Sequence, residues 1–175
     1  MASSVRLLSS PMAAVLGGLF AVSASWAHAQ ESIRMSAITH LAKGTFTVDI
    51  KPSGEGNTAD GVTLGRMSLN KKFDGDLQGT GSGEMLTAMT AVKGSAGYVA
   101  IERVTGQLAG RRGSFVFQHT GTMNHGAQQL AITVVPDSAT GELQGLSGAF
   151  RIVIRDGKHF YEFEYVLPAS VKAGG

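Results

Sequence analysis

The chain has 175 residues and contains no cysteine. Disulfide bonds are therefore excluded, and stability has to come from burial and backbone hydrogen bonds. Charge of either sign is also scarce: the formal net charge is +2, and no basic run is longer than two residues. These absences give no reason to expect nucleic acid or an anionic membrane as a partner.

The motifs of common enzymes and metal sites are missing as well. The sequence holds no Gly-x-Ser-x-Gly elbow, no His-Glu-x-x-His and no His-x-His pair. No sequence motif therefore supports a serine hydrolase or a conventional metal site, and we expect neither a metal nor a cofactor. His119, His125 and His159 are scattered, so a zinc site would need a tertiary coincidence.

Residues 1–29 have the features of a signal peptide. Arg6 precedes an apolar run, and Ala27-His28-Ala29 is a small-x-small cleavage signal. The apolar run is too short for a spanning helix, which needs about 20 residues. Cleavage before Gln30 would remove Trp26, the only tryptophan, and lower the net charge to +1. We therefore expect an exported protein, periplasmic or secreted, with no membrane association after cleavage.

Most of the remaining chain has the sequence pattern of β-strands. We expect a leader at 30–42, a β domain at 43–168 and a short tail at 169–175. From Gly44 onward, apolar and polar residues alternate as in half-buried strands, and turn signals such as Asp156-Gly157 separate the runs. The pattern predicts about eight strands with hairpin-sized connections; residues 87–97 have room for one helical turn.

Eight antiparallel strands close naturally into a barrel, which is the fold that we predict; a two-sheet sandwich is the alternative. An internal repeat supports strong bending, because residues 105–115 and 140–150 share six of eleven positions, including three glycines. We expect the glycines at 106, 110, 141 and 145 to permit the curvature of the strands.

The direction of the side chains follows from charge. An unpaired buried charge costs several kcal/mol, so charged residues on otherwise amphipathic strands should face solvent. This places Glu162, Glu164, Arg151 and Arg155 outside, and it leaves an aromatic lumen that could bind a small apolar or aromatic molecule. The expected ligand-binding residues are Tyr98, Phe115, Phe117, Tyr161, Phe163 and Tyr165.

Glu102 and His119 are the candidate catalytic pair. If Arg103 faces outward, its neighbour Glu102 faces inward, on a strand joined to that of His119 by the hairpin at 110–113. Contact between the two would require a stagger or a bulge. Alternatively, Glu102 is a rim carboxylate paired with a nearby arginine (Arg103, Arg111 or Arg112), and His119 is a core histidine.

Three stretches of this chain, 113–123, 140–148 and 157–165, resemble a bacterial family of unknown function with an allene oxide cyclase-like barrel. The resemblance covers about residues 40 to 168. It implies an eight-stranded antiparallel barrel related in shape to the plant allene oxide cyclases and dirigent proteins, which steer cyclisation or coupling of reactive small molecules. No motif of the plant cyclases matches residue by residue, so none of their catalytic positions is carried over.

Three functions remain open at this point. The first is a ligand-binding barrel for a small hydrophobic molecule. The second is a cofactor-independent isomerase or cyclase, in which replacing Glu102 or His119 should abolish turnover and leave the melting temperature nearly unchanged. The third is a structural or interaction protein, a homo-oligomer with a solid core.

Overall fold

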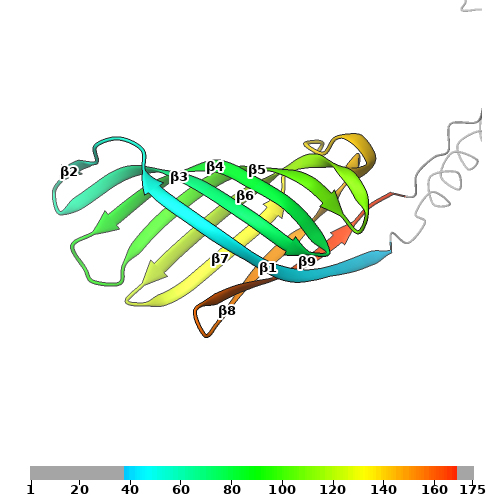
Figure 1. Ribbon diagram of the computed structural model, residues 1–175. Helices are drawn as coiled ribbons and strands as arrows, with labels where there is room; N and C mark the ends of the chain where they lie inside the picture. Colours follow the sequence, from blue (N-terminus) through cyan, green and yellow to red (C-terminus); the bar gives the residue numbers. More distant parts are fainter. Residues whose placement is uncertain (1–37, 169–175) are drawn as a thin grey trace, which may run out of the picture. The chain divides into compact units, whose positions relative to one another are not determined.

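The computed structural model describes residues 38–168, which form a closed antiparallel β-barrel (Figure 1). Eight long strands build the barrel in the order β1-β9-β8-β7-β6-β5-β4-β3, and β1 pairs with β3 to close it. The three-residue strand β2 pairs with the first residues of β3. Their bounds are β1 Thr39–Pro52, β2 Asn57–Ala59, β3 Val62–Gly75, β4 Leu77–Thr90, β5 Ala96–Leu108, β6 Arg111–Asn124, β7 Ala127–Val134, β8 Ser147–Arg155 and β9 Lys158–Val166.

The prediction of an eight-stranded antiparallel barrel is confirmed, and the sandwich is wrong. The only helical segment among residues 38–168 is the 3₁₀ turn η1, Gly141–Leu143, so the helical turn expected within 87–97 is wrong: β4 continues to Thr90. Nor does any helix in this part of the chain have the length and apolar character to cross a membrane. The predicted signal peptide and tail lie outside the described residues.

The first strand begins earlier than the sequence indicated. β1 starts at Thr39, so the last four residues of the expected leader belong to the barrel. Their inward side chain is the buried methyl group of Ala42, and Gly44 follows on the same face. Because neither is a bulky apolar residue, the alternation that marks a strand is invisible there.

Four hairpins have two-residue turns in which both residues have positive φ. Such turns twist in the same sense as the strands that they join, and they favour glycine at the second position. They fix the register of the barrel, because one turn of this kind leaves one possible pairing of the two strands. The turns are Asp60-Gly61, Ala109-Gly110, His125-Gly126 and Asp156-Gly157, and they confirm the predicted turns at the last two sites.

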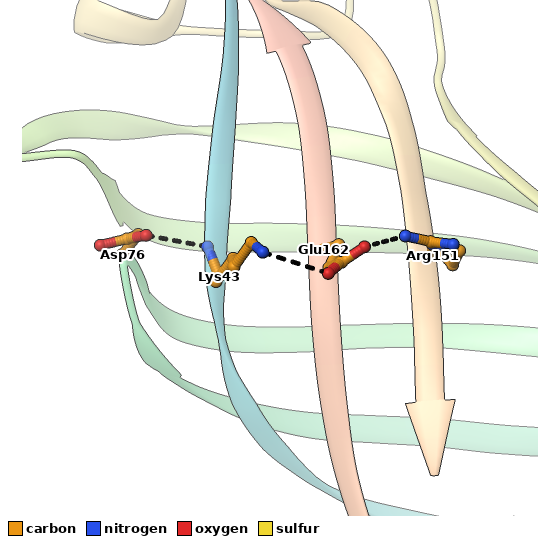
Figure 2. Close-up of polar contacts among 4 residues, drawn as sticks. All are labelled: Lys43, Asp76, Arg151 and Glu162. Carbon is orange, nitrogen blue, oxygen red and sulfur yellow. Dashed lines mark hydrogen bonds and ion pairs between the residues drawn. The ribbon is translucent and has the colours of Figure 1, made fainter.

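Lys43 lies where β1 passes from pairing with β9 to pairing with β3 (Figure 2). Its backbone N–H donates to the Asp76 carboxylate over 2.8 Å, and its ammonium lies 3.2 Å from Glu162. Glu162 also pairs with Arg151 of β8. These ion pairs are on the outer face of the barrel, where each contributes little to the free energy of unfolding. They lie along the strands that close the barrel but are not what stabilises the closure.

The two copies of the internal repeat lie against each other, although their backbones differ. The first runs through β5 into β6, whereas the second begins as η1. The Thr140 N–H donates to the Ser114 carbonyl, and the Ser114 N–H donates to Thr140 Oγ1. Leu143 and Leu146, both fully buried, then cover this end of the barrel.

The expected role of the repeat glycines needs correction. Gly141 and Gly145 have φ of +62° and +81° in the loop before β8, so they permit a turn and not the curvature of a strand. Gly110 belongs to a hairpin turn. Only Gly106 lies within a strand, where an added Cβ would be 2.0 Å from the Gln78 carbonyl oxygen of β4.

Candidate functional site

Aromatic rings fill the half of the barrel next to η1. Phe115, Phe117 and Phe163 are fully buried, with centroids 4.9 Å apart for the first two and 5.4 Å for the last two. Tyr161 accepts a hydrogen bond from the Leu77 N–H over 2.8 Å, a structural role for its hydroxyl. These contacts correct the expectation of a ligand site among the rings, because the rings occupy the space that a ligand would need.

Tyr165 is also a buried residue, exposed by 6%, and its ring stacks on that of His40. Five of the six predicted ligand-binding residues therefore lie in packed surroundings. Tyr98, near the opposite end of the barrel, lines an open pocket between the inner faces of the strands. Tyr161 borders a different concavity, beside Lys43 and Phe160.

Lys71, whose inward position the sequence pattern does not reveal, projects into this core from β3. Its side chain is 4% exposed, and its ammonium lies 5.2 Å from the centroid of Phe46, 5.8 Å from that of Phe73 and 6.0 Å from that of Phe150. A cation over aromatic faces is stabilised electrostatically. The aromatic lumen is therefore occupied by a side chain of the protein itself.

The Lys71 ammonium donates a hydrogen bond to Glu102 Oε2 over 2.8 Å. The same oxygen lies 3.0 Å from His119 Nε2, at a bent donor angle. The Glu102 side chain is fully buried, and the three side chains form a continuous polar cluster in the apolar interior. We call Lys71, Glu102 and His119 the buried cluster.

The structure brings the predicted pair together without a bulge. Ala100 lies opposite His119, and Glu102 lies opposite Phe117, so Glu102 and His119 are diagonal neighbours on adjacent strands. The expectation that contact needs a stagger or bulge is wrong, because the tight turn at 109–110 already aligns them. The alternative of a rim carboxylate paired with arginine is also wrong, since the partner is Lys71.

Glycines on β4 make room for the Glu102 carboxylate. A Cβ on Gly81 would lie 1.9 Å from Glu102 Oε1, and one on Gly83 would lie 2.7 Å from the Glu102 Cα. This close approach explains why glycines alternate on β4. Within residues 38–168, no donor reaches Oε1, which rests against the Gly81 backbone.

A pocket of about 320 Å³ opens on the inner faces of β4 to β7, at the end of the barrel away from η1. We call it the mouth pocket. The Tyr98 ring lies on Gly121, where a Cβ would come within 2.1 Å of Tyr98 Cε1. The apolar lining of the pocket includes Met85, Met89, Met123 and Leu130.

Comparison with known proteins identifies the family. The model of a family described as a protein of unknown function, DUF3224, matches residues 42–165. The chain belongs to this family. A solved structure of a DUF3224 protein of unknown function from Shewanella oneidensis MR-1 is 51% identical, with a TM-score of 0.72 over 76% of this chain and all of that one. A search of the curated proteins finds no match.

Membership in DUF3224 confirms the predicted resemblance to a bacterial family of unknown function. The chemistry of the barrel has to be argued from its own residues. In the part of this DUF3224 chain that the structure describes, no three His, Asp or Glu side chains gather as they would to hold a metal ion.

Opposing effects set the charge of Glu102 in the DUF3224 barrel. Burial alone would raise the pKa of the carboxyl, but the close contact with His119 Nε2 and the charge and hydrogen bond of Lys71 outweigh it and lower the pKa. Glu102 is therefore an ionised acceptor. In an uncharged imidazole, an acceptor beside Nε2 favours the tautomer with the proton on Nε2 and the lone pair on Nδ1.

Acidification should remove the contribution of Glu102 to stability. Its pKa is lower in the folded barrel than the ordinary value of 4.5, so the contribution is complete above that value and is lost as pH falls through the folded pKa. We expect the free energy of unfolding, measured in urea at a series of pH values, to fall below pH 4.5. The double variant Lys71→Met/Glu102→Gln should show a shallower fall; an equal fall would contradict this account.

Proposed function

We propose that this DUF3224 protein binds a small apolar molecule in the mouth pocket. The supporting observation is the pocket itself, an apolar concavity of about 320 Å³ at the end of the barrel. Tyr98, which carries a polar hydroxyl group, is one of its lining residues. Small-molecule sites are commonly of this size and are found in the mouths of barrels. Methionine side chains suit such a site, because they are unbranched and adapt to different ligand shapes.

Filling the mouth pocket should abolish binding. Met89 lines the pocket and is 51% exposed, so Met89→Trp can fill the space with little cost to the fold. The neutral fluorescent probe 1-aminoanthracene, titrated into the protein, should bind the parent and should bind Met89→Trp at least roughly tenfold more weakly, a loss of about 1.4 kcal/mol. The control Thr47→Trp, exposed on the outer face of β1, should bind like the parent.

Equal affinity of Met89→Trp and the parent would place any probe site elsewhere. No saturable binding by the parent, at concentrations where the probe is soluble, would count against the mouth pocket as a site for molecules of this kind.

We further propose that the barrel is of the allene oxide cyclase-like type. Its support is the closed arrangement of eight antiparallel strands together with the resemblance of the stretches described above. Because shape does not carry activity, the proposal concerns architecture alone.

We also propose that the protein is exported, with residues 1–29 removed. Support comes from Arg6, the apolar run and Ala27-His28-Ala29. Intact-mass measurement of the protein isolated from its host should give a chain that begins at Gln30. A full-length chain retained in the cytoplasm would contradict the proposal.

A further inference from the structure

We propose that the mouth pocket is also a catalytic site, in which His119 and Tyr98 move a proton within a bound unsaturated ketone. This inference rests on the proposed binding of an apolar molecule in the pocket and goes beyond it. The class of substrate is a β,γ-unsaturated ketone on an apolar frame, and the product is the conjugated ketone.

The pocket reaches the level of His119 in the barrel. Ala100 of β5 pairs with Met85 of β4 on one side and with His119 of β6 on the other. The next inward pair toward the mouth is Tyr98 of β5 with Gly121 of β6. Because Ala100 presents only a methyl group, His119 and Met85 face each other across a small residue. Met85, Tyr98 and Gly121 all line the pocket. His119 is the next inward residue of β6 after Gly121, so the register places it behind this lining.

The buried cluster prepares His119 to act as a base. Its Nε2 lies 3.0 Å from the ionised Glu102. A proton held on Nε2 leaves the lone pair of the ring on Nδ1, the nitrogen that we propose to meet the substrate. Lys71 holds Glu102 from the other side over 2.8 Å and balances its charge. His119 is thus the proposed catalytic residue, whereas Glu102 and Lys71 are positioning residues.

Tyr98 supplies the acid side of the site. Its ring is fixed by the contact with Gly121, and burial together with the negative charge of Glu102 raises the pKa of its hydroxyl. The hydroxyl therefore keeps its proton at neutral pH and can donate a hydrogen bond to a carbonyl oxygen. A donor placed where negative charge develops stabilises the transition state.

The proton transfer is balanced without a co-reactant. Nδ1 of His119 takes a proton from the carbon between the carbonyl and the double bond, and the electrons of that C–H bond form an enolate whose oxygen accepts a hydrogen bond from Tyr98. The imidazolium then returns the proton to the far carbon of the original double bond. The product is the conjugated ketone, and His119 is neutral again.

Met85 separates His119 from the pocket. Its side chain is partly buried, and an unbranched thioether changes rotamer easily, so a ligand can displace it. Met85→Ala should therefore raise the rate of the reaction, an effect that a purely structural role of His119 would not produce.

The test uses two bicyclic ketones with the full chain. The saturated decalone reports binding, by displacement of 1-aminoanthracene, and a β,γ-unsaturated octalone reports catalysis, by the ultraviolet absorbance of the conjugated product. The parent should bind decalone and isomerise octalone. Tyr98→Phe and His119→Gln should lower kcat/KM by at least roughly a hundredfold while leaving the Kd of decalone within about twofold.

The outcomes separate the two proposals. Binding of decalone without isomerisation of octalone overturns the catalytic inference and leaves the binding proposal standing, whereas failure of decalone to displace the probe overturns both. A full rate in His119→Gln also overturns the inference. Tyr165→Phe, a tyrosine on the inner face of β9 outside the pocket, is the matched control and should keep the parent rate; if His119→Gln does not fold, Tyr98→Phe and Met85→Ala decide.

Discussion

Replacing Glu102 with glutamine is expected to lower the free energy of unfolding by about 3–5 kcal/mol. The substitution leaves the Lys71 ammonium without its anionic partner in a site where the lysine side chain is 4% exposed. An uncompensated buried charge is costly, because water no longer solvates it. Urea unfolding of the parent and the variant would measure the loss.

Two further variants make this test specific. Lys71→Met/Glu102→Gln removes the stranded charge and should recover most of the loss, because an apolar replacement of a buried pair is often neutral. Glu84→Gln removes one partner of an exposed pair with Arg66, so it should have little effect. A loss for Glu102→Gln no larger than that for Glu84→Gln would show that the buried cluster does not stabilise the fold.

This result also changes how Glu102 variants can be used. The sequence suggested that replacing Glu102 would leave the melting temperature nearly unchanged, and the contact with Lys71 argues against that expectation. Loss of activity in Glu102→Gln would therefore not distinguish chemistry from folding. For this reason the catalytic inference is tested on Tyr98 and His119, with binding measured in parallel.

Replacing Gly106 with alanine should lower the free energy of unfolding by about 3 kcal/mol, at the upper end of the usual cost of overpacking. The added Cβ would lie 2.0 Å from the Gln78 carbonyl oxygen and 2.8 Å from the Gly79 Cα. Both are backbone atoms of the paired strand β4, so no side-chain rotation relieves the clash. Strand propensity alone predicts a gain, because glycine is unfavourable in strands.

Gly97→Ala in the same strand is the matched control for Gly106→Ala. The nearest atom to its added Cβ would be the Gly121 carbonyl oxygen at 3.9 Å, an ordinary contact. Urea unfolding should therefore place Gly97→Ala close to the parent. If the two alanine variants unfold at the same urea concentration, close approach of β4 and β5 does not explain the glycine at 106.

Much of the fold could be predicted from local patterns. The alternation of Phe46 and Val48 with polar residues, and turn pairs such as Asp156-Gly157, are properties of neighbouring residues, and they sufficed for the strands and hairpins. The start of β1 was missed because Ala42 and Gly44 carry no apolar bulk on the inward face. The alternation indicated which aromatic rings point inward. It could not indicate that these rings fill the barrel interior, because a local pattern does not give the interior volume.

The candidate site likewise contains residues that a local pattern could place and one that it could not. Glu102 and His119 could be placed inside because Arg103 had to face water, and the hairpin between their strands made them neighbours. Lys71 was missed although it alternates with buried Leu69 and Phe73, since the charge rule that placed other residues outside excluded it. Its position depends on the path of β3 around the barrel, which no stretch of sequence near Glu102 contains.

Because β1 pairs with both β3 and β9, the barrel can close only late in folding. The first long strand completes its hydrogen bonding only when the last one arrives, with Thr39 opposite Val166. Contacts so distant along the chain slow folding, because a long loop must close before they form. The barrel therefore cannot close before β9 has been synthesised, and a chain that still lacks β9 carries β1 with one edge unpaired.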